Sequence, residues 1–87
     1  MVELNRAVAI AMAFGPAAGL ELVDQIAATG TLQNYHLLPS IRGDFLFKLG
    51  RFSEAHAEFL HGAALTQNAR ERELLLSRAQ ECNATLP

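Results

Sequence analysis

The chain has 87 residues, enough for one domain with a single modest hydrophobic core. Seven Lys and Arg residues stand against nine Asp and Glu residues, a net charge of -2, and the basic residues form no stripe, which argues against direct binding of nucleic acid. Hydrophobic residues make up 51% of the sequence and charged residues only 18%, so we expect another domain or another copy to cover part of the apolar surface.

The cysteine count and the apolar segments indicate the cellular compartment. The single cysteine, Cys82, excludes an internal disulfide and favours a reducing environment. The uncharged, apolar stretch of residues 7–20 is too short to span a bilayer and is interrupted by Gly15 and Pro16. The first residues lack the basic region, apolar core and cleavage site of a signal peptide. We therefore expect a cytoplasmic protein without a membrane segment.

The first predicted helix covers residues 2–14. Its polar side chains all lie in the first turn and a half, and the eight residues that follow carry none. A helix that is apolar on every side is buried on every side, and 87 residues can hardly cover it. We therefore expect it to contact another domain or another copy. Gly15 ends this helix, and Pro16 suits the first position of a second helix over residues 16–29.

The middle of the chain predicts a loop over residues 29–34 and then a third helix that begins near residues 35–36. Pro39 must lie in its first turn, because deeper inside the ring would clash with the preceding turn. Leu49 closes the helix, and Gly50 can adopt the left-handed conformation that ends it.

Two more helices complete the prediction. The fourth covers residues 53–65, with Ser53 as its N-cap. Asn68 and Glu71 match a capping box that opens the fifth helix, which ends near residue 83 and is followed by a fraying tail.

The helix pairs repeat. Gly15 and Gly50 each end a first helix, 35 residues apart, and such a period with helix-turn-helix content is typical of tetratricopeptide (TPR) architecture. The second unit fits the TPR spacing at Gly43, Leu46, Leu49, Gly50, Phe52, Ala55 and Phe59. It departs at Gly62 and Gln67, and the first unit fits less well. We predict an all-α fold of about five antiparallel helices in TPR-like pairs, the fifth helix acting as a cap; the alternative is an unrelated helical bundle.

Three segments, VELNRAVA, GPAAGL and YHLL, together with RGDFLFKLGRFSEAHAEF, carry a narrower resemblance. Over nearly all of its length the chain is similar to the C-terminal extension of one class of extracytoplasmic-function (ECF) RNA polymerase sigma factors, in which a TPR-like region follows two promoter-binding domains. Pro39 departs from that pattern. The resemblance implies that the parent protein acts in transcription initiation and that this chain, without the sigma domains, is a fragment or an excised domain.

The resemblance also implies a docking role, on the sigma domains, on RNA polymerase or on a regulator. TPR-like units bind through the inner face of each first helix. Carried over to this sequence, these positions are Asn5, Ala9, Met12, Leu37, Ser40, Asp44, Phe47 and Lys48. Such a groove suits an amphipathic helix or an extended segment, and it lacks the Lys, Arg and Asn set that clamps a C-terminal carboxylate. The alternative is that these side chains pack only against each other.

Arg6 follows Asn5 in the otherwise apolar first helix. A buried arginine needs a partner, and Glu3, Asp44 and a carboxylate outside this chain are the candidates. We favour an ion pair between Arg6 and Asp44 that holds the first helix to the third.

No catalytic or metal site is expected. The spacing of His56 and His61 turns the two rings away from each other, and neither cysteine nor carboxylate completes a set with His36. Glu54 and Glu58 are explained by a solvated helix face. We predict a non-enzymatic interaction domain without a cofactor; the alternative is a stand-alone TPR-like scaffold that forms a homo-oligomer through its first helix.

Overall fold

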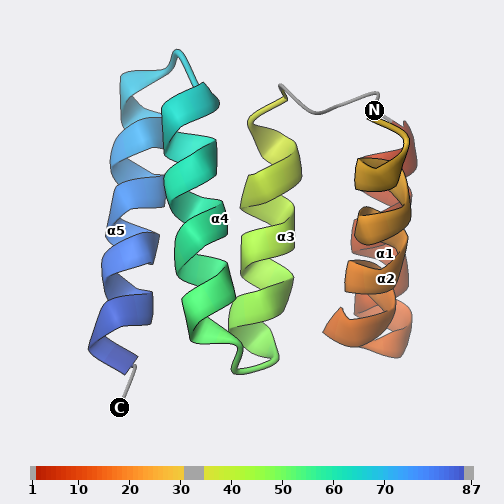
Figure 1. Ribbon diagram of the computed structural model, residues 1–87. Helices are drawn as coiled ribbons and strands as arrows, with labels where there is room; N and C mark the ends of the chain where they lie inside the picture. The colour runs from red at the N-terminus through yellow and green to blue at the C-terminus, as the bar shows by residue number, and fades with distance from the viewer. Residues whose placement is uncertain (1, 31–34, 86–87) are drawn as a thin grey trace.

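The structure is a computed structural model that describes the backbone of residues 2–30 and 35–85 and the side chains of residues 4–30 and 35–84. These residues form five α-helices and no strand, which confirms the predicted all-α fold (Figure 1). The helices are α1 (Val2–Phe14), α2 (Pro16–Ala28), α3 (Leu37–Lys48), α4 (Phe52–Leu65) and α5 (Ala69–Thr85).

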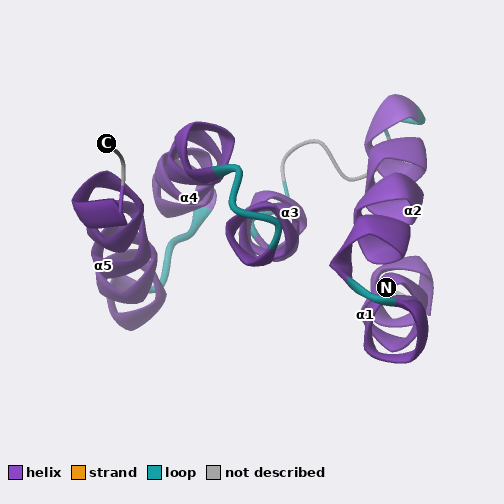
Figure 2. Ribbon diagram, turned by 90° about the horizontal axis from the view of Figure 1, so that it is seen from below, coloured by secondary structure: helices purple, strands orange, loops and turns teal. Residues whose placement is uncertain are grey.

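Each helix packs beside the next one along the chain and runs antiparallel to it (Figure 1). Seen end-on, α2 and α4 lie towards one side of the molecule, and α1, α3 and α5 lie towards the other (Figure 2). The molecule measures 30 × 29 × 19 Å along its principal axes. The α1, α3 and α5 side carries the candidate site.

Glycine conformation sets the two tight helix junctions, as predicted. Gly15 has φ 102° and Gly50 has φ 78°, values that favour glycine because it has no Cβ. Pro16 takes the first position of α2, where its missing N–H costs no intrahelical bond. After α3, the Arg51 N–H donates to the Leu46 carbonyl at 2.9 Å and closes the turn.

The helix starts differ in detail from the prediction. Pro39 is the third residue of α3 and therefore lies in its first turn, as expected. The N-cap assigned to Ser53 is wrong: α4 already begins at Phe52, and its N-cap residue, Arg51, makes no side-chain cap bond. The Arg51 guanidinium instead pairs with Glu54 in the first turn, where a carboxylate also complements the helix dipole.

The start of α5 confirms half of the predicted capping box. The Asn68 side-chain oxygen accepts hydrogen bonds from the backbone N–H groups of Arg70 and Glu71, at 2.9 and 3.1 Å. The Glu71 carboxylate does not return to Asn68; it accepts the Thr66 hydroxyl at 2.9 Å. Buried Thr66 takes over the second role, because its hydroxyl oxygen accepts the Asn68 N–H at 3.2 Å. The helix then continues to Thr85, two residues beyond the predicted end.

The core forms where glycines allow close helix contact. A Cβ on Gly43 would lie 2.8 Å from the ring of Phe59, so α3 and α4 approach as the TPR spacing requires. A Cβ on Gly19 would lie 2.6 Å from Ala11 Cβ and 2.9 Å from the ring of Phe45, so α1, α2 and α3 meet at this point. The largest fully buried side chains are Phe59, Leu46, Val23 and Cys82.

As expected from its apolar sequence, α1 is not covered on every side by this chain alone. Leu4 and Ala7 are buried, but Val8 is 38%, Met12 84% and Phe14 79% exposed. The two most exposed large apolar side chains among the described residues, Met12 and Phe14, therefore lie on this first helix. Within the described residues, no helix combines the length and apolarity needed to cross a membrane.

Candidate functional site

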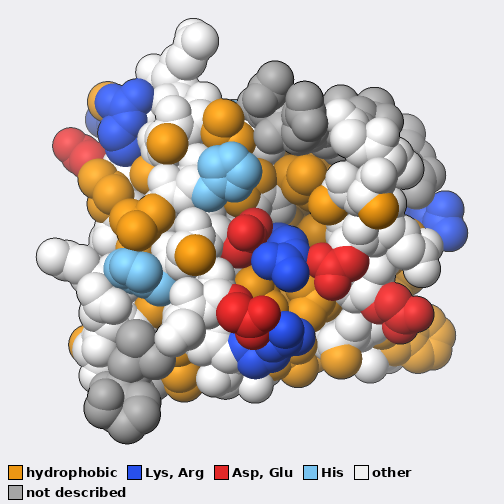
Figure 3. All heavy atoms as spheres, viewed as in Figure 1, with side chains coloured by type: hydrophobic (Ala, Val, Ile, Leu, Met, Phe, Trp, Pro, Cys, Tyr) orange, Lys and Arg blue, Asp and Glu red, His pale blue; other side chains and the backbone are white. Residues whose placement is uncertain are grey.

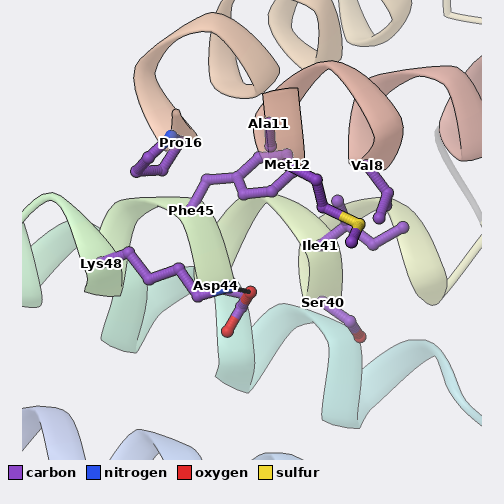
Figure 4. Close-up of a pocket in the computed structure, with 9 residues that line it drawn as sticks. All are labelled: Val8, Ala11, Met12, Pro16, Ser40, Ile41, Asp44, Phe45 and Lys48. Carbon is purple, nitrogen blue, oxygen red and sulfur yellow. Dashed lines mark ion pairs between the residues drawn. The ribbon is translucent and has the colours of Figure 1, made fainter. Parts of the chain in front are cut away.

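A hollow of about 420 Å³ lies between α1 and α3 and is the candidate site (Figure 4). Nine residues line it: Val8, Ala11, Met12, Pro16, Ser40, Ile41, Asp44, Phe45 and Lys48. We call this surface the α1–α3 groove. Its lining residues come from α1, α3 and the first residue of α2.

The walls of the groove are apolar. Val8 and Met12 are one helical turn apart on α1, and Ile41 and Phe45 are one turn apart on α3, so each pair projects from one face of its helix. Figure 4 shows the Met12 side chain reaching towards Ile41 across the groove. Phe45 is 3% exposed and forms the floor, whereas Met12 remains 84% exposed at the mouth.

The second edge of the groove is polar and follows α3 at intervals of four residues. The Ser40 hydroxyl donates to the His36 carbonyl at 2.8 Å, and Asp44 Oδ2 lies 3.0 Å from Lys48 Nζ. In Figure 4, Ser40 and Asp44 point away from α1. The polar edge is therefore set by bonds within the chain, and Lys48, 59% exposed, is its most exposed member.

The α5 residue Arg78 fixes Asp44 from the other side. Its Nη2 donates to Asp44 Oδ1 at 3.0 Å, and its guanidinium lies 5.4 Å from the ring centroid of Phe47 and 4.8 Å from that of Phe59. Burial alone would raise the pKa of Asp44, but hydrogen bonds from Lys48 and Arg78 outweigh it and hold that pKa below its ordinary value. Asp44 is thus a fixed anion at neutral pH.

Of the eight residues predicted to form the groove, four line it: Met12, Ser40, Asp44 and Lys48. Asn5 and Ala9 are exposed on α1 outside it. Phe47 turns towards α4 and α5, where its ring packs edge-on against Phe52 at 5.1 Å between centroids. It was predicted to line the groove, and it is instead part of the packing that supports the groove.

Leu37, the eighth predicted residue, lies in a second and smaller hollow of about 180 Å³ between α3 and α5. His36, Glu71 and Leu74 line it too. His36 Nε2 approaches Glu71 Oε2 to 2.6 Å, but without the angles of a hydrogen bond, so it is a close contact of two polar groups. This hollow shares Ser40 with the groove, and the inner face of α3 therefore separates two depressions.

The ion pair predicted between Arg6 and Asp44 is replaced by others. Arg6 lies exposed on α1, so the premise that it is buried is wrong. The Asp44 carboxylate is held by Lys48 and Arg78, which ties α3 to α5 rather than to α1. Glu3, the other candidate partner within the chain, lies outside the described side chains.

The opposite face carries charges of both signs. Figure 3 shows them gathered over the middle of the molecule, where α3 lies between α2 and α4. Arg42 on α3 pairs with Asp24 on α2 at 2.7 Å and with Glu58 on α4 at 3.4 Å. Burial raises the pKa of Glu58, although Arg42 opposes the shift. These pairs tie the two layers together.

The histidines have structural surroundings. His56 Nδ1 lies 2.9 Å from the Ala79 carbonyl and thereby links α4 to α5. Among the residues whose positions are described, no three His, Cys, Asp or Glu side chains gather closely enough to hold a metal ion. Cys82 is fully buried, and burial raises the pKa of its thiol.

Sequence reasoning missed the five apolar residues that line the groove: Val8, Ala11, Pro16, Ile41 and Phe45. Ile41 and Phe45 were not among the inner-face positions carried over to the third helix, and the others lie in a stretch without polar residues. The signal lay in the helical period, because residues four apart such as Val8 and Met12 share one face. What the sequence lacked was the angle at which the first helix pair meets the third helix.

Comparisons with known proteins add one relative. No protein-family model and no solved structure matches the chain. Over 71 residues it is 39% identical to an uncharacterized protein of Rhizobium meliloti (strain 1021). The match covers 82% of this chain and 16% of the relative, so the chain spans about one sixth of that protein.

Proposed function

We propose that this chain is a non-enzymatic protein-docking domain whose binding surface is the α1–α3 groove. The observation that carries the proposal is an apolar hollow beside a protruding apolar side chain, Met12, which is 84% exposed. Large apolar side chains that cluster around a concave surface are typical of sites that another molecule covers.

The chemistry of the groove indicates the kind of partner. Val8, Met12, Ile41 and Phe45 offer an apolar trough between two helices, which suits the apolar face of an amphipathic helix. Methionine has three rotatable bonds and a polarizable sulfur, so Met12 can adapt to the shape of the ligand. Buried apolar area supplies the affinity, and the polar edge along α3 limits the orientation of the ligand.

The polar groups of the groove favour docking over catalysis. The Ser40 hydroxyl is bonded to a backbone carbonyl, and the Asp44 carboxylate is held by two cations. Neither is positioned as an activated nucleophile or as a general base with a raised pKa. The proposed role is therefore binding, without a cofactor.

We further propose that the parent protein is an ECF-type RNA polymerase sigma factor and that this domain is its C-terminal regulatory extension in the cytoplasm. The support is the resemblance carried by VELNRAVA, GPAAGL and YHLL. The Rhizobium relative, which contains a matching segment within a much longer chain, is compatible with such a setting. The groove would hold a surface of the sigma domains, and a regulator or RNA polymerase would shift that equilibrium.

Two steps test the proposal. The genomic reading frame around Met1 should continue upstream into promoter-binding sigma domains; a genuine start codon at Met1 would refute the sigma-factor assignment. Those domains, expressed as a separate polypeptide, should then shift the NMR amide signals of residues 8–16 and 40–48 of this chain.

Matched variants make the titration specific to the groove. Met12→Glu places a charge at the mouth and should weaken binding at least about tenfold, the effect of 1.4 kcal/mol. Leu60→Glu, at a 42% exposed position of α4 outside the groove, should leave binding unchanged. Equal losses in both variants, or signal shifts confined to α4 and α5, would contradict the proposed surface.

A further inference from the structure

We infer that, when no other protein occupies it, the α1–α3 groove is covered by the same groove of a second copy of this chain, in a two-fold symmetric dimer. This inference concerns the resting state of the chain and does not rest on the sigma-factor assignment. The second copy would cover the exposed apolar surface of α1, and three features of that surface support this arrangement.

The first feature is that a protrusion and a hollow lie on one patch. The Met12 side chain stands at the mouth of the groove, and Val8 and Ile41 line the adjoining apolar hollow (Figure 4). In a two-fold interface the same patch is used by both copies, so a patch needs both shapes to fit itself. Here each Met12 can enter the hollow of the other copy, and the two insertions are equivalent.

The second feature is the charge pattern of the polar edge. Asp44 and Lys48 carry opposite charges one helical turn apart on α3. If two copies meet with their α3 helices antiparallel, Asp44 of each copy faces Lys48 of the other, and both pairs are attractive. A parallel arrangement would bring like charges together. The pattern is therefore self-complementary for the antiparallel arrangement that a two-fold axis across the helices produces.

The third feature is the absence of charge on the rest of the patch. Residues 7–20, which include the whole α1 wall of the groove and Pro16, contain no charged side chain. Two copies can therefore approach without opposing like charges or burying an unpaired one. A partner of different chemistry would gain nothing from this wall beyond apolar contact, whereas the polar edge specifically matches its own copy.

The dimer and the docked state use the same groove, so they exclude each other. A partner that binds the groove must displace the second copy, and its apparent affinity falls as the concentration of the chain rises. Dimerisation would thus keep the apolar surface of α1 covered until a partner is present.

Sedimentation velocity of the 87-residue chain, from low to high micromolar concentration, tests the inference. The unchanged chain should pass from monomer to a compact dimer. Met12→Glu should raise the dissociation constant at least about tenfold. Lys48→Glu should raise the dissociation constant by a similar factor, because the new carboxylate of each copy would face Asp44 of the other copy and the two would repel.

Two controls keep the test specific. Leu60→Glu introduces a charge at an exposed apolar position of α4, and Arg70→Glu reverses an exposed charge on α5; both lie outside the groove and should dimerise as the unchanged chain does. Circular dichroism verifies that each variant is folded. A chain that stays monomeric throughout, or a dimer that Met12→Glu and Lys48→Glu leave intact, overturns the inference. Either result would leave docking of another protein in the groove to be decided by its own titration.

Discussion

The two end helices of the stack, α1 and α5, differ in the polarity of the surface that no neighbouring helix covers. Each packs on one neighbour and has no helix on its other side within the described residues (Figure 1). The buried residues of α5 are Leu75, Ala79 and Cys82, and charged side chains such as Arg70, Glu73 and Glu81 are exposed on its remaining surface. Leu4 and Ala7 of α1 are buried, but beyond its first turns the exposed side chains, among them Met12 and Phe14, are apolar.

This difference shows which end of the helix stack has the polar outer face of a terminal cap. A terminal repeat needs a polar outer face, and α5 supplies one, although Leu74 and Leu76 remain partly exposed. Helix α5 is also tied to α3 by the Arg78–Asp44 ion pair. The contrast fits a cap at α5 and supports the proposed binding role of α1.

The largest expected effect is a direct test of this contrast. Leu75→Ala on α5 should lower the free energy of unfolding by about 2–5 kcal/mol, because the side chain is buried and its removal leaves a cavity. Met12→Ala on α1 should change it by less than about 0.5 kcal/mol, because the side chain is mostly exposed. Urea unfolding followed by circular dichroism measures both, at a concentration where the chain is monomeric. Similar losses in the two variants would show that α1 packs as a second cap.

Substitution of Gly43, where α3 and α4 are in close contact, should have the next largest effect on stability. Gly43→Ala places a methyl group 2.8 Å from the ring of Phe59 and should destabilise the chain by about 1–3 kcal/mol. Gly62→Ala is the matched control, because its nearest neighbours lie at 3.1–3.4 Å and the gain in helix propensity offsets the crowding. A Gly43→Ala protein as stable as the unchanged chain would mean that α3 and α4 are not in close contact.

The next prediction concerns the ion pair between Arg78 and Asp44, which links α5 to α3. Arg78→Ala removes the ion pair with Asp44 and the contacts with two rings, and should cost about 1–2 kcal/mol at neutral pH. Arg70→Ala, on the exposed first turn of the same helix, should cost less than about 0.5 kcal/mol.

The effect of Arg78→Ala should also depend on pH. Because the pKa of Asp44 is lowered in the folded chain, the stability that its charge contributes is present above the ordinary aspartate pKa of about 3.9 and is lost as the pH falls through the folded pKa. The difference in stability between the two proteins should therefore shrink below that range to the part that the ring contacts contribute. A difference that is constant with pH would assign the effect to packing alone.

The smallest effect lies on the opposite face. The pKa of Glu58 is raised by burial, so its ionised form opposes folding once the pH exceeds that folded pKa. Glu58→Gln should thus slightly raise the free energy of unfolding at neutral pH, and the gain should vanish below the ordinary glutamate pKa of about 4.3. Thermal unfolding at neutral and acidic pH measures the change; a loss of stability at neutral pH would show that the contact with Arg42 outweighs burial.

The fold was predictable from the sequence because local signals agree with one another. Gly15, Pro16 and Gly50 mark two helix junctions through backbone conformation alone, and the spacing of Gly43 and Phe59 predicts a close helix pair. The N-cap at Ser53 was mispredicted because the turn closes through the backbone of Arg51 instead.

The site was only partly predictable, because it depends on long-range geometry. The inner-face positions Met12, Ser40, Asp44 and Lys48 followed from helical spacing. The direction of Phe47 depends on Arg78 and Phe52, which come from two other helices. The sequence of one helix does not show which of two neighbouring helices a side chain at the edge of its buried face will pack against.

The most direct test of the docking surface is the rate of oxidation of Met12 by hydrogen peroxide, followed by mass spectrometry. The comparison is between this chain, dilute enough to be monomeric, and the polypeptide encoded by the complete reading frame. Because Met12 is 84% exposed, it should form the sulfoxide rapidly in the isolated chain. If the groove holds another segment of the parent protein, oxidation of Met12 should slow several-fold in the longer polypeptide. Equal rates in the two would contradict the assignment of the groove as a docking surface within the parent protein.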